Sequence, residues 1–211
     1  MKYIGMPIGM WALFAHSFRK QLTAVFGYDA DMANGITRKA KPRYREIIAG
    51  LPEFENADRF KMNIVNCAMI GAFILSMPEH PDVEQLTEYY AKAMMTKPMK
   101  WFCRRSGNNK FTKKDINEMK ATASFKAADR NPYSWNMDFF EYPDGSGYEC
   151  RFTKCGICVL MQNLGLYDLT PALCRLDYTM SEAGSVTDFV RQYTLASGGL
   201  YCDCVYKKKM L

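Results

Sequence analysis

The feature that most constrains the fold is a change in the spacing of apolar residues along the chain. In the first 95 residues apolar side chains recur at helical spacing, most clearly at Trp11, Phe14, Ala15, Phe18, Leu22 and Phe26. From Tyr148 to Cys155 the apolar residues alternate with polar ones, as in a half-buried strand. The change predicts an α+β protein in which an N-terminal helical bundle packs on a C-terminal β-α-α-β-β antiparallel sheet.

The 211 residues suffice for a single domain with a sizeable core. We divide the chain into a helical part (1–95), a basic connector (96–135, least structured up to about Phe111) and a cysteine-rich α+β part (136–211). Helices are expected over 7–26, over a short segment after Pro42, over 60–77, from Pro81 onward, and over 112–130. The last part should hold a strand over 148–155, a helix over 156–164, a helix over 170–184 capped by Thr170, and a hairpin of strands 186–195 and 200–206.

The positive charge of the chain is local. The net charge is +6, and the basic residues gather between Arg104 and Arg130 and in the run 207–209. A solvated helix face explains this better than an anionic partner, and no nucleic-acid motif accompanies it. No apolar run reaches the roughly 18 residues that span a bilayer, and Pro7 interrupts the apolar N-terminal stretch. We expect a cytoplasmic protein with free thiols that binds neither nucleic acid nor membrane, and a homo-oligomer is compatible with the sequence.

Six of the eight cysteines follow position 149, namely Cys150, Cys155, Cys158, Cys174, Cys202 and Cys204. A tight turn around 197–199 would pair Tyr193 with Cys202 or Cys204, so that Arg191, Tyr193 and both thiols share one side of the sheet. On the helix over 170–184, the three-residue spacing places Cys174 and Asp177 on one face. Cys155 lies where a strand meets a helix. These groups are therefore expected to converge between sheet and helices.

Simpler explanations exist for each of these residues. A free cysteine is most often a small buried apolar side chain, Asp177 could be a surface carboxylate, and Arg191 could belong to a structural ion pair. Zinc held by Cys155, Cys158, Cys202 and Cys204 is disfavoured, because the C-x-x-C pair lies on an apolar helix rather than a tight turn. Redox chemistry at Cys155 and Cys158 lacks a thioredoxin-like βαβ context. We expect no metal and no cofactor.

The C-terminal third resembles one known family. The residues that carry the resemblance are Cys155, then Leu164-Gly165, then Cys174 followed by Asp177, then the stretch from Arg191 to Gly198, then Cys202-Asp203. This order is similar to the signature of the L-2-amino-thiazoline-4-carboxylic acid hydrolase family, except that Cys204 stands where the family has a phenylalanine. The resemblance covers about the last 60 residues and implies hydrolytic opening of a thiazoline ring to N-carbamoyl-cysteine.

Such a reaction needs a base, a proton for the departing sulfur and an anchor for the substrate carboxylate. We assign Asp177, Cys174 and Cys155 as catalytic candidates, with a cysteine nucleophile and direct attack by water both left open. Arg191, Tyr193 and Cys202 are the candidates for substrate binding, because a guanidinium matches a carboxylate. The alternative is a non-catalytic small-molecule-binding or sensor domain, similar in layout to the vinyl-reductase-like ligand-binding domains. A metal-thiolate protein is the third hypothesis.

Overall fold

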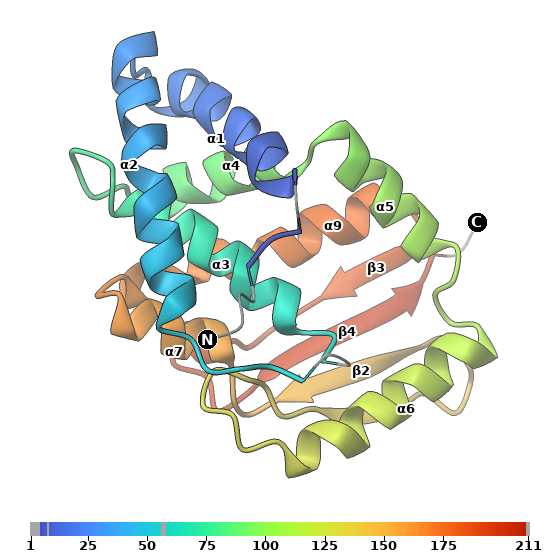
Figure 1. Cartoon of the computed structure of the whole chain (residues 1–211). Helices are drawn as coiled ribbons and strands as arrows, with labels where there is room; N and C mark the ends of the chain where they lie inside the picture. Colours follow the sequence, from blue (N-terminus) through green and yellow to red (C-terminus); the bar gives the residue numbers. More distant parts are fainter. Residues whose placement is uncertain (1–4, 8, 56–57, 210–211) are drawn as a thin grey trace.

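The computed structural model describes residues 5–7, 9–55 and 58–209 and contains the helical part and the sheet that the sequence predicts (Figure 1). The helices are α1 (Met10–Phe26), α2 (Ala30–Ala49), α3 (Lys61–Ile74), α4 (Val83–Met94), α5 (Lys97–Gly107), α6 (Lys113–Ala128), α7 (Gly156–Asn163), α8 (Thr170–Cys174) and α9 (Leu176–Gly184). The strands are β1 (Asp138–Glu141), β2 (Gly147–Phe152), β3 (Thr187–Val190) and β4 (Cys202–Lys208). The α+β class is thereby confirmed.

The helix α3 lies at the centre of the helical part. Its residues from Ile64 to Ile74 are buried except for Asn66, and it contacts α2 and α7. A helix that is apolar all round needs neighbours on every side, and the other helices supply them. Among the described residues no helix combines the length and the apolar character needed to cross a bilayer.

The sheet is antiparallel with the strand order β1-β2-β4-β3. The strand β1 was missed from the sequence, because four residues at a sheet edge give too short an alternation to recognise. In the central pair, Tyr148 lies opposite Tyr206, Cys150 opposite Cys204 and Phe152 opposite Cys202. Side chains on directly opposed residues share a face, so these six form one apolar face of the sheet. The helix α6 covers part of that face through Met119 and Ile116.

The second helix begins earlier than predicted. It runs from Ala30, where Asp29 caps it by accepting a hydrogen bond from the Met32 amide (2.8 Å), and it contains Pro42. The prediction that it starts after Pro42 is wrong. Ala33, Ile36 and Ala40 are buried against neighbouring helices, and this packing supports the helix through the proline despite the lost backbone hydrogen bond.

Two further predictions need correction. Residues 97–107, expected only as a basic connector, form the helix α5, which Thr96 caps by accepting from the Met99 amide (3.3 Å). The helix expected over 170–184 is divided at Arg175 into α8 and α9. Thr170 is not its cap, because Thr170 lies inside the first turn with its hydroxyl buried and without a hydrogen-bond partner.

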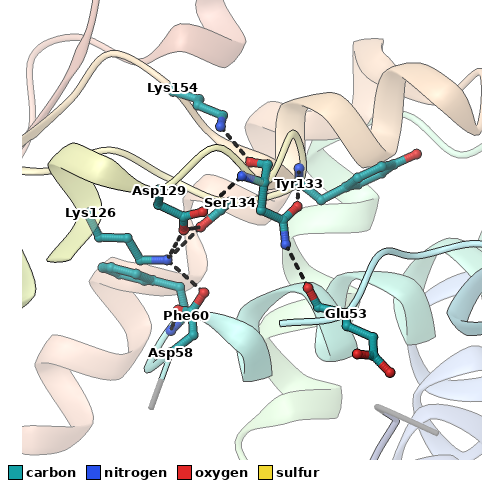
Figure 2. A network of polar contacts seen from close by, with 9 residues as sticks. Glu53, Asp58, Phe60, Lys126, Asp129, Tyr133, Ser134 and Lys154 are labelled. Carbon is teal, nitrogen blue, oxygen red and sulfur yellow. Dashed lines mark hydrogen bonds and ion pairs between the residues drawn. The ribbon is translucent and has the colours of Figure 1, made fainter. Parts of the chain in front are cut away.

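A buried lysine joins the helical part to the loop that precedes the sheet (Figure 2). Lys126, near the end of α6, is fully buried, and its Nζ donates to Asp58 (2.7 Å), Asp129 (2.9 Å) and Ser134 (2.5 Å). The ammonium also lies 5.3 Å from the centre of the Phe60 ring. A buried charge is tolerated only when it is paired and hydrogen-bonded in this way.

We expect Lys126→Met to lower the free energy of unfolding by about 3–5 kcal/mol, because two carboxylates lose their buried counter-ion. The matched control is Lys120→Met on the same helix, where an exposed pair with Glu141 (2.7 Å) should contribute less than about 1 kcal/mol. Urea denaturation of both variants measures the difference. Equal stability of the two variants would show that the buried pair does not hold the fold.

Candidate functional site

A cavity of about 210 Å³ lies between the apolar face of the sheet and the helices α3, α4, α8 and α9. The cavity is lined by polar and thiol side chains from separate elements, namely Asn66, Tyr90, Cys155, Cys174, Asp177, Arg191, Cys202 and Cys204. Five of the six candidate residues from the sequence therefore meet here. The sixth, Tyr193, does not.

Cys155 is the N-cap residue of α7. It follows β2 closely in sequence, and Gly156 allows the loop before β1 to pack against it, since a Cβ at Gly156 would lie 2.0 Å from the Tyr133 carbonyl oxygen. Lys154 donates to the Asn131 carbonyl of the same loop (2.5 Å). The loop and the start of α7 are thus fixed to each other, and Cys155 is held between them.

The pKa of the Cys155 thiol is lowered to about 7. The largest cause is the hydrogen bond with the thiol of Cys158, and the backbone N–H groups of Cys158 and Ile157 and the side chain of Trp135 add to it, while burial opposes it. These backbone groups lie in the first turn of α7, where the N–H groups of a helix start favour a negative charge. The surroundings of Cys155 therefore favour its thiolate form.

The other thiols of the cavity are held in their protonated form. Burial raises the pKa of Cys174 to about 12, and it also raises the pKa values of Cys202 and Cys204. None of these three cysteines lies at the start of a helix. Among the thiols that line the cavity, Cys155 is the one whose pKa is lowered.

Arg191 is nearly buried, with a side chain that is 5% exposed. Its NH1 group donates to the Cys174 carbonyl oxygen (3.1 Å), and its NH2 group contacts the Cys204 sulfur (3.1 Å) and forms an ion pair with Asp177. The Nε–H group is buried and has no hydrogen-bond partner. The fork of the guanidinium is therefore already engaged, and one buried donor is left over at the cavity.

A second orphan atom lines the same cavity. The Asn66 side-chain oxygen on α3 is buried without a partner, amid a helix that is otherwise apolar on this stretch. A buried polar atom without a partner costs roughly 1–3 kcal/mol. The cavity therefore presents one unmet donor, at Arg191, and one unmet acceptor, at Asn66.

Tyr193 lies outside the cavity, because β3 ends before it. The register of Val190 opposite Val205 agrees with the predicted pairing of Tyr193 with Cys202, but the predicted strand is too long. The β3–β4 ladder ends at Val190, which pairs with Val205, and the chain then leaves the sheet. The Asp203 carboxylate causes this departure by accepting hydrogen bonds from the backbone N–H groups of Gln192 (3.0 Å) and Tyr193 (2.6 Å). The Tyr193 ring is 50% exposed and packs on Tyr201 instead. Arg191 still shares a face with Cys204, as predicted.

The profile of the L-2-amino-thiazoline-4-carboxylic acid hydrolase family matches residues 57–206. The chain belongs to this family. The family resemblance found in the sequence is thereby confirmed, and the matched range contains every residue that lines the cavity. The name of the family supports a hydrolase role. Neither the curated proteins nor the solved structures gave a match.

The four cysteines considered as zinc ligands are Cys155, Cys158, Cys202 and Cys204. They do not form one cluster. Cys202 accepts a hydrogen bond from the Leu195 amide (3.2 Å), and Cys204 contacts Arg191. Over the described ranges, no three or more His, Cys, Asp or Glu side chains are arranged to hold a metal ion.

Several residues that line the cavity were missed from the sequence, and three of them bear on its chemistry. Asn66, Tyr90 and Trp135 come from α3, α4 and the loop before β1. Asn66 could have been singled out from the sequence, because a lone amide side chain on an otherwise apolar helix face is costly to bury without a polar partner. Nothing in the sequence singles out Tyr90 or Trp135, since aromatic residues at such positions usually belong to the hydrophobic core.

We expect iodoacetamide to alkylate Cys155 before the other cysteines, with a rate that rises as pH increases through about 7, because only the thiolate reacts. Mass spectrometry of digests taken between about pH 5.5 and pH 9 measures this. A Cys155→Ala variant, in which the early phase disappears, is the control. A half-point near the ordinary pKa of about 8.5 would contradict the account.

Proposed function

We propose that the protein hydrolyses L-2-amino-thiazoline-4-carboxylate, or a closely similar cyclic amidine, to an N-carbamoyl-L-cysteine-type product. The observation that carries the proposal is the Cys155 thiol, with its pKa near 7, at a small cavity that also presents an unpaired donor of Arg191 and an unpaired acceptor of Asn66. Family membership supports the hydrolase class.

The size of the cavity supports a small substrate. Its volume of about 210 Å³ is below the roughly 300–1,000 Å³ of ordinary ligand pockets. A molecule of amino-acid size fits this space.

The two orphan atoms suggest how the substrate is oriented. The Nε–H group of Arg191 donates to the substrate carboxylate, and the Asn66 oxygen accepts from the exocyclic amino group. Arg191 contributes its Nε–H group in this pose, because Asp177, Cys204 and the Cys174 carbonyl engage three of the four N–H groups on its two terminal nitrogens.

The thiolate of Cys155 then adds to the ring carbon that lies between nitrogen and sulfur. The bond from this carbon to the ring sulfur breaks, and the sulfur leaves and takes a proton from solvent. The substrate is now joined to Cys155 through its amidine carbon. Water adds to that carbon, one of its protons passes to an amidine nitrogen and the other to solvent, and the carbonyl group forms as the Cys155 thiolate leaves, so that one water molecule is consumed for each ring opened.

Asp177 is the candidate base for the attacking water. One of its oxygens contacts Arg191, and the carboxylate lines the cavity with a side chain that is 45% exposed, so its other oxygen is accessible to water. Cys174 and Cys202 contact the substrate as neutral thiols in this scheme, because burial raises their pKa values.

We expect the wild type to turn over a member of a panel of thiazoline and amidine carboxylates, and Cys155→Ser to lose at least roughly a thousandfold in kcat/KM. Release of free thiol and of carbamoyl product measures turnover. Cys103→Ser is the matched control, since Cys103 is a buried thiol on α5 that does not line the cavity.

Equal turnover by Cys155→Ser and the wild type would remove the nucleophilic role and leave direct attack by water. Saturable binding of a panel member without any product, seen as a thermal shift, would instead support the non-catalytic binding domain.

A further inference from the structure

We propose that Cys155 and Cys158 form a reversible disulfide, which makes this pair a modification site for peroxide-type oxidants. The pairing itself stands on the local geometry of α7. Its effect on turnover rests on the proposed function, because a disulfide removes the thiolate from the cavity.

The two cysteines lie across the first turn of α7. Cys155 is the N-cap residue in an extended conformation (φ −134°, ψ 116°), and Cys158 is the third residue of the helix. Each thiol is the largest influence on the pKa of the other, as expected for two side chains that lie next to each other on one helical turn. Both are free and half-buried, and Cys155 opens into the cavity, which gives a small oxidant a route to its sulfur.

The pair is also chemically asymmetric. The interaction with Cys155 and burial raise the pKa of Cys158 well above its usual range, whereas the pKa of Cys155 at the helix start is lowered. A low-pKa, accessible thiol beside a second thiol is the arrangement found at redox-sensitive cysteines. Cys155 is therefore the sulfur that reacts with the oxidant, and Cys158 is the sulfur that resolves the product.

The reaction needs only peroxide. The Cys155 thiolate attacks one oxygen of hydrogen peroxide and hydroxide leaves, which produces a sulfenic acid. The sulfur of Cys158 then attacks the Cys155 sulfur, releasing water and losing its proton. The protein loses two hydrogen atoms, and two equivalents of a thiol reductant restore both thiols.

Competing partners are less well placed. Cys174 and Cys202 are near enough to affect the titration of Cys158, but they lie on α8 and β4, and the Cys202 sulfur accepts a hydrogen bond from the Leu195 amide. Cys67 on α3 is fully buried. Only Cys158 shares a helical turn with Cys155.

The test is peptide mapping after peroxide treatment. Trypsin cuts after Lys154 and Arg175, so Cys155, Cys158 and Cys174 fall in one peptide, and chymotrypsin cuts between Cys158 and Cys174 at Leu164 or Tyr167. We expect the fragment with Cys155 and Cys158 to lose two hydrogens while Cys174 still reacts with a thiol label, and dithiothreitol to reverse the change.

Cys158→Ser separates the two chemical steps. We expect peroxide to leave this variant with a sulfenic acid at Cys155, which a dimedone probe captures, whereas the wild type shows little probe adduct. A disulfide from Cys155 to Cys174 or Cys202, or a stable sulfenic acid in the wild type, would overturn the proposal. Because mass is the readout, the outcome does not depend on whether the protein turns over any substrate.

Discussion

The buried ammonium group of Lys126 is the interaction on which the site depends. It ties together Asp58 just before α3, Asp129 at the end of α6, and Ser134 in the loop before β1 (Figure 2). The pKa of Asp129 is lowered although burial opposes it, because Ser134 and Lys126 donate hydrogen bonds to its carboxylate. This network holds the loop whose next residue is Trp135.

The loop before β1 connects the hydrogen-bond network of Lys126 to the Cys155 thiol. Trp135 packs on Phe60 with ring centres 5.3 Å apart, and its side chain helps to stabilise the ionised form of Cys155. Gly156 lets the loop backbone approach α7 without a Cβ in the way. The buried Lys126 ammonium group takes no part in the proposed reaction. It nevertheless helps to position Cys155, which in our proposal attacks the substrate. In Cys174, Cys202 and Cys204 burial is the largest cause of a raised thiol pKa, and the Asp177 carboxylate adds to it.

Much of this architecture could be predicted from local pattern. The helical spacing before residue 95, the alternation after Tyr148 and the order of cysteine, aspartate and arginine gave the fold class and the family. Three things were beyond reach for physical reasons. Packing against other helices keeps Pro42 inside α2, the Asp203 carboxylate draws Tyr193 out of the ladder, and β1 is too short to show an alternation. Each depends on contacts between residues far apart in the sequence or on too few residues to form a pattern.

The most direct test of the account is a crystal structure of the Cys155→Ser variant with L-2-amino-thiazoline-4-carboxylate. The account predicts the ligand in the cavity between the sheet and α3, with its carboxylate on the Nε–H group of Arg191, its amino group on Asn66 and its amidine carbon facing residue 155. A ligand bound elsewhere on the protein, or one whose amidine carbon faces away from residue 155, would contradict it.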